Sequence, residues 1–516
     1  MITVKNRLDD LLGRATMYRL VSVVLGFIAA VAVVLASTER LDPTIFEPGA
    51  MMLTLLVLMV ASLAASRLCA TIWRTTPHLE SAVITALLLW FLYWPSTDPT
   101  TLAWLAAAAA LAHLSKYVIA WRGRHVLNPA AAGAALLVLA GEVLDSVPLT
   151  TWWAASEALF PFVLVGAGLV LYRTGRFELA AVFAVLAAVL TYWGVSGFIS
   201  DTGDALSFVV YSTPIVFFAG FMLSEPLTLP PRRRQQVAVA AVAAVVFTWP
   251  LFSQRVLDDP FALGPFEGTY ELALVVANVI AFGLGQRGGL RLDVREVRPL
   301  AGDVWEIVFE PQRPVRFVAG QYLELDLPHP GADRRGSRRM FTISSPPGAA
   351  TVTVAVRVPE VSSSFKQALL ALEPGTVVTA TGVHGDFVWP DAGRPVVLVA
   401  GGIGVTPFLS QLRADRDRDA VLVYGVPDAD EVPYRDELVD VGARVVLVAP
   451  APPADLPEGW RHVPAPFVTG DTVADAVPDL ASRSAFVSGP PAMVDAVRQS
   501  LRRRCAAVHT DHFTGY

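Results

Sequence analysis

The fold of the second half of the chain is decided by one stretch, Val396-Val-Leu-Val-Ala-Gly401-Gly402-Ile-Gly404-Val-Thr406-Pro407. An apolar run leads into three glycines, and a Thr-Pro pair then opens a helical pattern. A buried strand that ends in glycines before a helix brings the backbone close to the pyrophosphate of a dinucleotide. One glycine turn is a weak signal on its own, so the surrounding pattern decides its meaning.

Short apolar runs separated by helix-like segments surround this turn. Because strands alternate with helices, residues 393–516 predict a doubly wound α/β nucleotide-binding domain. Residues 288–392 show short alternating runs with Gly and Pro breaks, which predict a small antiparallel β-barrel. The expected barrel strands are 290–297, 304–309, 322–327, 340–344, 352–358 and 377–382, and the expected parallel strands are 396–400, 421–424, 445–448 and 485–487.

One expected barrel strand carries Arg339-Met340-Phe341-Thr342. A bound flavin needs a cation near its pyrophosphate, an aromatic plane beside its ring and a donor near N5. Arg339, Phe341 and Thr342 can supply these in order, since alternate strand residues share a face. The alternative is an arginine and an aromatic residue on an ordinary strand. Further on, Val361-Ser-Ser-Ser364-Phe365-Lys366 offers hydroxyls and amides for phosphate oxygens, or a serine helix cap.

Taken in order, the Arg-x-Phe-Thr strand, the serine turn, the glycine turn and Ser488-Gly489-Pro490-Pro-Ala-Met493 resemble the ferredoxin–NADP reductase superfamily over residues 289–516. The resemblance implies FAD on the barrel and a nicotinamide nucleotide on the parallel sheet. It puts Thr342 near flavin N5 and Ser488 where the family has a cysteine beside the nicotinamide. The tail Asp511-His-Phe513 is similar to the family's acidic-x-aromatic ending, with Phe513 covering the flavin and Asp511 as a nearby carboxylate. Val361 stands where the family has a glycine before its serine turn.

These residues form the expected site of the second half. The expected catalytic residues are Thr342, Ser488, Asp511 and Phe513. The expected cofactor-binding residues are Arg339, Met340, Phe341, Thr342, Val356, Val358, Ser363, Ser364, Phe365, Gly401, Gly402, Gly404, Thr406, Pro407, Gly489, Pro490 and Met493. A 2′-phosphate usually requires an arginine after the second sheet strand. The segment that follows Tyr424 is acidic and has no arginine before Arg435, which favours NADH over NADPH.

The composition of the whole chain shows two different environments. The 516 residues are 54% hydrophobic and only 17% charged, whereas soluble domains carry about 25% charged residues. Residues 1–286 hold 34 of the 86 charged side chains and residues 287–516 hold the other 52. A polytopic membrane domain, residues 1–287, is therefore expected to precede the soluble domains. The net charge of −6 gives no basic footprint for nucleic acid, and the two cysteines cannot build a four-cysteine iron–sulfur site.

Apolar runs of the first half predict about ten transmembrane helices. Lys and Arg gather in alternate loops, and the intervening loops are often acidic. By the positive-inside rule, both termini are expected in the cytoplasm, and the protein is expected to be a multi-pass protein of the cytoplasmic (inner) membrane. The first run has no clear cleavage site and is expected to be a retained helix. The expected spans are 18–37, 50–66, 80–95, 101–117, 128–144, 153–172, 178–197, 208–225, 236–252 and 269–286.

Two polar clusters lie at span ends on the expected cytoplasmic face. Asn128 can cap a helix that opens with Pro129, which leaves free amides beside Arg122, Arg124 and His125 for a phosphate. Glu225 lies where a proline breaks an apolar run. Polar groups are costly in hydrocarbon and therefore mark candidate sites. The alternative is that both clusters are helix caps and positively charged flanks.

The segments Asn128-Pro-Ala and Ser224-Glu225-Pro-Leu-Thr-Leu-Pro resemble those of the membrane flavin subunits of the Rnf and sodium-pumping NADH:quinone reductase complexes, over about residues 50–250. The resemblance implies a flavin, FMN or riboflavin, near Asn128 and Glu225. Those subunits hold FMN covalently through an Asp-x-x-Ser-Gly-Ala-Thr motif, and Ser-Gly-Ala-Thr is missing here. We therefore expect non-covalent flavin rather than attachment at Thr151, with an empty scaffold as the alternative. Three histidines in this half are too few for a pair of bis-histidine haems, and no metal site is expected.

Together these features predict a membrane-bound flavin oxidoreductase. Electrons are expected to pass from NAD(P)H through FAD to a membrane flavin, and then to a quinone or a partner protein. The alternative is a membrane-anchored transporter or scaffold whose reductase domain reduces a separate redox partner. Ten spans are more than a tether needs, which argues against a simple anchor.

Overall fold

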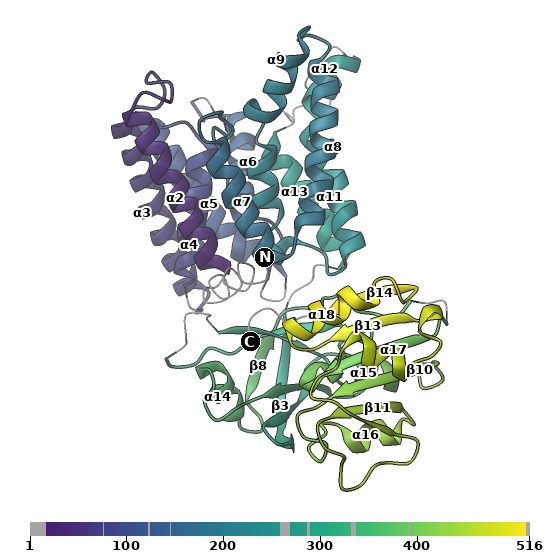
Figure 1. Ribbon diagram of the computed structural model, residues 1–516. Helices are drawn as coiled ribbons and strands as arrows, with labels where there is room; N and C mark the ends of the chain where they lie inside the picture. Colours follow the sequence, from purple (N-terminus) through teal and green to yellow (C-terminus); the bar gives the residue numbers. More distant parts are fainter. Residues whose placement is uncertain are drawn as a thin grey trace. The chain divides into compact units, whose positions relative to one another are not determined.

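The structure is a computed structural model that describes residues 17–75, 77–121, 124–144, 146–257, 269–285, 289–331, 337–390 and 393–511. The chain divides into two compact units, which meet in sequence between Gly288 and Gly289. We call them the helical unit and, after the resemblance of residues 289–516, the reductase unit, and we describe each by itself (Figure 1).

The helical unit is built from apolar helices. Its elements are α2 (Met17–Ser37), α3 (Pro48–Ile72), α4 (Leu79–Leu92), α5 (Pro99–Val118), β1 (Ala120–Trp121), β2 (Arg124–His125), α6 (Pro129–Gly141), α7 (Phe160–Thr174), α8 (Phe177–Val195), α9 (Thr202–Ser207), η1 (Phe208–Ser212), α10 (Ile215–Phe217), η2 (Phe218–Leu223), η3 (Pro226–Thr228), α11 (Arg233–Phe247), α12 (Trp249–Leu257) and α13 (Tyr270–Gly283).

Every expected span contains helix, but the helices differ in length. Among the described residues, α2, α3, α8 and the segment Thr202–Leu223 are long and apolar enough to cross a membrane. A fifth span results if α11 and α12, which are bent by 51°, count as one. Four further apolar helices, α4, α6, α7 and α13, have 13 to 15 residues, short of the roughly 20 that a bilayer requires. These helices are consistent with a membrane protein, but the expected ten full spans are not confirmed.

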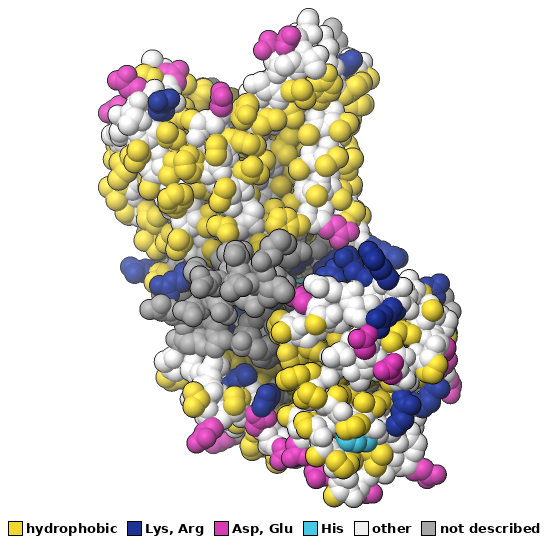
Figure 2. Space-filling view, viewed as in Figure 1, with side chains coloured by type: hydrophobic (Ala, Val, Ile, Leu, Met, Phe, Trp, Pro, Cys, Tyr) yellow, Lys and Arg dark blue, Asp and Glu magenta, His cyan; other side chains and the backbone are white. Residues whose placement is uncertain are grey.

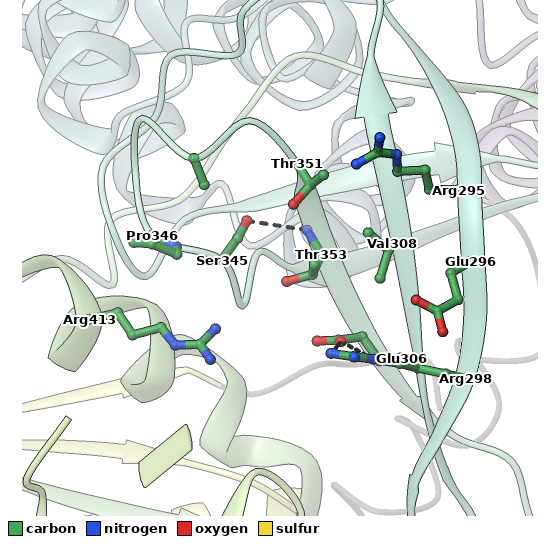
Figure 3. Close-up of a pocket in the computed structure, with 11 residues that line it drawn as sticks. Arg295, Glu296, Arg298, Glu306, Val308, Ser345, Pro346, Thr351, Thr353 and Arg413 are labelled. Carbon is green, nitrogen blue, oxygen red and sulfur yellow. Dashed lines mark hydrogen bonds and ion pairs between the residues drawn. The ribbon is translucent and has the colours of Figure 1, made fainter. Parts of the chain in front are cut away.

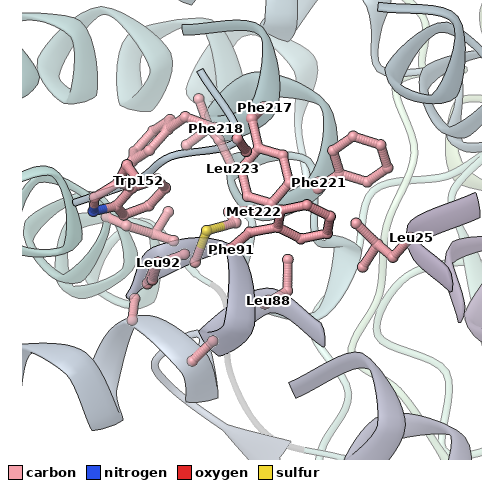
Figure 4. Close-up of a cluster of buried hydrophobic side chains, with 14 of the residues drawn as sticks. Leu25, Leu88, Phe91, Leu92, Trp152, Phe217, Phe218, Phe221, Met222 and Leu223 are labelled. Carbon is pink, nitrogen blue, oxygen red and sulfur yellow. The ribbon is translucent and has the colours of Figure 1, made fainter. Parts of the chain in front are cut away.

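Aromatic side chains form a cluster within the buried hydrophobic core of the helical unit (Figure 4). Trp152 and Phe218 pack with ring centroids 5.8 Å apart, and Phe91 lies 5.4 Å from Phe217. The expected span 208–225 is not one regular helix, because Pro214 separates η1 from α10 and the chain continues as the π-helix η2. Outward-facing positions are also apolar, and hydrophobic side chains cover much of this unit's visible face (Figure 2). A surface of this kind suits lipid rather than water.

The reductase unit begins with a six-stranded antiparallel sheet. Its strands are β3 (Leu290–Ala301), β4 (Val304–Pro311), β5 (Tyr322–Asp326), β6 (Arg338–Thr342), β7 (Val352–Arg357) and β8 (Val377–Ala380), in the order β6-β5-β8-β3-β4-β7. The Ser344 amide donates to the Thr353 carbonyl at 2.9 Å and so links the two edges of the sheet. The six expected strands are present and form a half-barrel around one apolar core. Helix α14 (Ser364–Leu370) follows β7.

The second part of the reductase unit is a six-stranded parallel sheet, in the order β12-β11-β10-β9-β13-β14. The strands are β9 (Val396–Gly401), β10 (Ala420–Gly425), β11 (Arg444–Ala449), β12 (Arg461–Pro464), β13 (Ser484–Ser488) and β14 (Ala507–Asp511). The helical segments are η4 (Gly402–Val405), α15 (Thr406–Ala414), α16 (Arg435–Asp440), α17 (Gly470–Ala476), η5 (Leu480–Ser482) and α18 (Pro491–Leu501). Strand order reverses between β9 and β13, where open α/β sheets bind ligands.

Candidate functional site

Two glycine turns meet at the ends of β9 and β13. A Cβ on Gly404 would lie 2.4 Å from the Ser488 carbonyl oxygen, and one on Gly401 would lie 2.7 Å from Met493 Sδ. Gly489 has φ +153° and lies against the backbone of Gly401. By contrast, a Cβ on Gly402 would meet nothing within 4 Å among the described residues. The turns therefore pack tightly together and leave one open backbone face, as the close approach of a dinucleotide requires.

The remaining expected residues of this turn lie at its edges. Thr406 and Pro407 open α15, and Thr406 Oγ1 donates to the Ile403 carbonyl at 3.2 Å. Pro490 precedes α18 and would lie 2.9 Å, through its Cδ, from a Cβ on Gly401. These side chains stabilise the turn itself, so backbone groups are what it offers to a nucleotide.

Ser488 lies in the centre of the site. It is fully buried, and its Oγ has no hydrogen-bond partner among the described residues. In the sheet register Ser488 lies between Ala400 of β9 and Asp511 of β14. Burial raises the pKa of the Asp511 carboxyl to about 7. The structure thus brings the expected Ser488 and Asp511 side by side, while Phe513 lies outside the described residues.

The expected flavin strand is β6. The Phe341 ring stacks on Phe365 with centroids 6.1 Å apart and an interplanar angle of 21°, and both rings are buried in the half-barrel core. The Arg339 guanidinium lies over the Phe365 ring, 5.1 Å from the ring centroid. Arg339, Phe341 and Phe365 are therefore brought together, with Phe341 as a core residue in this arrangement.

The other expected flavin residues divide into buried and exposed. Thr342 is 4% exposed, and within the described part of the chain its Oγ1 has no hydrogen-bond partner. Val356 belongs to the half-barrel core and Val358 packs against it, whereas Met340 is 37% exposed. A buried hydroxyl without a partner is costly. Thr342 and Ser488 both fit cofactor groups that complete their hydrogen bonds.

The serine turn acts as a helix cap. Ser363 is the N-cap of α14 and accepts from the Lys366 amide at 3.4 Å. The Ser364 hydroxyl contacts His329 Nε2 at 3.0 Å. His329 was not expected from the sequence, because it lies outside every motif and reaches the serine turn only through the fold.

In the helical unit, the two expected residues Asn128 and Glu225 are hydrogen-bonded to each other. Asn128 Nδ2 donates to Glu225 Oε2 at 2.8 Å, and Glu225 Oε1 lies 3.0 Å from His125 Nε2. The Asn128 side chain also caps α6, accepting from the Ala131 amide at 3.1 Å. Its backbone amide donates to Asn278 Oδ1 at 2.7 Å. Asn128 therefore caps α6 and also belongs to a polar cluster with Glu225, His125 and Asn278.

A buried carboxyl elsewhere in the helical unit was missed by the sequence reasoning. Glu271 is fully buried and accepts from Trp152 Nε1 at 3.0 Å and from Thr150 Oγ1 at 2.9 Å. The sequence signal that could have identified Glu271 is a single glutamate inside an apolar run. Thr151 does not hydrogen-bond to Glu271; its Oγ1 donates to the Leu92 carbonyl at 3.3 Å.

The fold and the glycine and hydroxyl site of the reductase unit define a flavin-dependent reductase with a nucleotide-binding α/β part. Residues 398–499 match the family described as oxidoreductase NAD-binding domain. The reductase subunit of aromatic O-demethylase from Amycolatopsis is 31% identical over 248 residues, covering 44% of this chain and 69% of that protein. The reductase component of propane 2-monooxygenase from Mycolicibacterium smegmatis is 29% identical, and the match covers 44% of this chain and 68% of that protein.

Among solved structures, a cytochrome P450 reductase from Amycolatopsis is 28% identical, with a TM-score of 0.38, covering 44% of this chain and 69% of that one. The relatives place the second half of this chain in the family of FAD-dependent ferredoxin–NAD(P) reductases, and the chain belongs to that family. It is an FAD-dependent NAD(P)H oxidoreductase. The helical unit is additional to the matched part, which covers 44% of the chain.

Proposed function

We propose that the protein passes electrons from NADH through FAD to a flavin in the helical unit, and then to a quinone or a partner protein. Bound FAD supplies the conversion of two-electron hydride chemistry into single-electron transfer. In this proposal residues 1–287 form a multi-pass domain of the cytoplasmic membrane, and both termini are cytoplasmic. Residues 288–392 bind FAD, and residues 393–516 bind the nucleotide.

The observation that carries this proposal is the contact between Asn128 and Glu225. These residues are 97 positions apart in the sequence, yet Asn128 Nδ2 and Glu225 Oε2 are 2.8 Å apart. Both belong to the segments that resemble membrane flavin subunits. Convergence of His125 and Asn278 on the same pair makes a compact polar site among the apolar helices of this unit. Such sites are functional candidates in membrane proteins.

In the reductase unit, this chain's own residues have distinct proposed roles. Backbone groups of Gly401, Gly402 and Gly404 hold the nucleotide pyrophosphate, and Ser488 orients the nicotinamide. Thr342 donates to the flavin near N5, and Arg339 neutralises the pyrophosphate of FAD. Asp511 holds a proton near the site, since burial raises its pKa to about 7.

The flavins of the full-length chain, purified in detergent without added flavin, test the proposal. Denaturation should release FAD and about one equivalent of FMN or riboflavin per chain. Release of FAD alone refutes the membrane flavin, and flavin that stays on the polypeptide refutes non-covalent binding. Glu225→Gln should lose the second flavin selectively. The matched control is Glu157→Gln, because Glu157 is an exposed glutamate of the same unit.

A second candidate function is reduction of a separate partner protein. It is favoured by the relatives, which are reductase components of an aromatic O-demethylase and of a propane monooxygenase. In that case the helical unit anchors or scaffolds the reductase. NADH oxidation in vesicles distinguishes the two. Turnover with quinone as the only added acceptor supports the first candidate, and turnover that requires an added partner protein and is unchanged in Glu225→Gln supports the second.

A further inference from the structure

Tyr434 connects the nucleotide-binding part of the reductase unit to the half-barrel. It immediately precedes α16 and has φ +62°, a left-handed conformation that residues other than glycine rarely adopt. Its side chain is 2% exposed. Unusual backbone conformations of this kind persist where the surrounding contacts hold them in place. The contacts of the Tyr434 hydroxyl show what holds Tyr434 in its left-handed backbone conformation.

The hydroxyl lies in a buried hydrogen-bond network. It donates to Glu306 Oε1 on β4 at 2.9 Å and lies 3.2 Å from Ser344 Oγ. The other oxygen of Glu306 accepts from Arg298 Nε at 2.9 Å and Nη2 at 2.5 Å. Glu306 is 2% exposed, so its carboxylate oxygens are hydrogen-bonded by these partners rather than by bulk water. The Tyr434 hydroxyl is thus held by the buried carboxylate of an ion pair of the half-barrel.

The network continues to the flavin strand. Ser344 Oγ lies 2.7 Å from Thr353 Oγ1, and the Ser344 amide donates to the Thr353 carbonyl. Ser344 follows Thr342 by two residues, so the network fixes the end of the strand that carries the unpartnered Thr342 hydroxyl. Tyr434 is therefore connected to the end of β6 through one side chain, that of Ser344.

A second connection lies beside the first. Ser410 on α15 donates to the Ser345 carbonyl at 2.7 Å, and Gln411 Nε2 donates to the Phe387 carbonyl at 2.7 Å. Helix α15 starts directly after the glycine turn. The nucleotide turn and the flavin strand are thereby joined through Ser345 as well as through Ser344.

The Arg298–Glu306 pair also lines an open cavity of about 620 Å³, with Arg413 of α15 across from Ser345 and Thr353 (Figure 3). The Arg298 side chain is 45% exposed there, whereas that of Glu306 is 2% exposed. Arg298, Glu306 and Thr353 therefore line the open cavity, whereas Tyr434 and Ser344 are buried and are not among its lining residues. The Tyr434 contact lies on this buried side, where hydrogen bonds are stronger.

We propose that Tyr434 is a positioning residue for hydride transfer, which sets the separation between Thr342 on the flavin strand and Ser488 at the nucleotide turn. Reaction rates depend steeply on this kind of separation, and a misplacement of about 1 Å costs up to about 100-fold. The proposal uses the reductase activity of the family and is independent of a flavin in the helical unit.

The test is Tyr434→Phe in the full-length, FAD-loaded protein, which keeps the ring and removes the hydroxyl. We expect flavin reduction by NADH in a single turnover to slow about tenfold, with the Kd for NADH within twofold of the wild type. The primary deuterium isotope effect should rise, because a longer transfer distance increases it. Independently of activity, hydrogen exchange of amides 342–345 should accelerate.

Tyr424→Phe is the matched control. Tyr424 is a buried tyrosine of β10 whose hydroxyl has no hydrogen-bond partner in the described segments. This variant should keep the wild-type rate and exchange. If Tyr434→Phe folds poorly, Ser344→Ala removes the hydroxyl that joins Tyr434 to the end of β6 and leaves the hydrogen bond between Tyr434 and Glu306 in place. An unchanged rate and isotope effect in either folded variant overturns the proposal, even if its melting temperature falls.

Discussion

Gly404→Ala is the substitution that most directly probes how the two glycine turns fit together. The added Cβ would lie 2.4 Å from the Ser488 carbonyl oxygen and 2.7 Å from the Gly489 Cα. Ordinary contacts require about 1 Å more, and both obstacles are backbone atoms that cannot rotate away. Overpacking of this kind costs about 1–3 kcal/mol, which lowers the melting temperature of a unit of this size by about 2–12 °C. The same shift of one turn should slow flavin reduction by NADH up to about 100-fold.

Thermal unfolding followed by flavin fluorescence, together with single-turnover reduction by NADH, measures both effects. Gly442→Ala is the control, because Gly442 has φ +67° and open space around it. Its cost is only the strain of about 1 kcal/mol for a side chain in the left-handed region, without a steric clash. If Gly404→Ala unfolds within 1 °C of the wild type and reduces flavin at the wild-type rate, the tight contact between the turns is wrong.

Three further substitutions test other parts of the chain. Phe341→Ala should cost about 3–5 kcal/mol through the cavity in the half-barrel core, measured by denaturant unfolding, and a loss under 1 kcal/mol would contradict its core position. Asp511 has a folded pKa of about 7, above the unfolded value of about 3.9, so the native state binds more protons and its stability falls as pH rises from about 4 to 7. Asp511→Asn should therefore raise the melting temperature at pH 8 and leave it unchanged at pH 4; equal effects at both would refute this. Glu225→Ala leaves Asn128 Nδ2 and His125 without their shared acceptor and should lower the melting temperature of the detergent-solubilised protein, whereas an unchanged value would mean that the cluster contributes little.

Alternating apolar patterns predicted the reductase fold well, because each expected strand is both apolar and bounded by Gly or Pro. Strands β12 and β14 were not predicted, because their sequences are not apolar runs. Arg461–Pro464 and Ala507–Asp511 are short, polar edge strands, and their position depends on pairing with β11 and β13 rather than on their own sequence. The parallel register next to Ser488 explains why Asp511 reaches the site at all.

In the helical unit, hydropathy located the helices but could not give their regularity. The π-helical stretch in 208–223 follows from packing around Pro214 and the aromatic cluster. Composition likewise does not distinguish a full span from the 14-residue helices α4 and α13. Long-range polar contacts, such as those of Glu271 and Tyr434, leave no periodic signal, because each joins segments more than 100 residues apart.

The candidate site of the reductase unit and that of the helical unit differ in how many of their polar groups already have hydrogen-bond partners. This difference determines how a ligand can gain affinity at each site. Thr342 Oγ1 and Ser488 Oγ are buried and, among the described residues, have no partners. A ligand that completes their hydrogen bonds removes a cost already present in the protein. Asn128 and Glu225, by contrast, already satisfy each other, and Glu225 also contacts His125. A flavin that binds these side chains directly must replace hydrogen bonds of similar strength, so part of its affinity has to come from ring burial against apolar side chains. Tight membrane flavin binding that survives Glu225→Gln would therefore place the flavin against the aromatic cluster instead of against this polar pair.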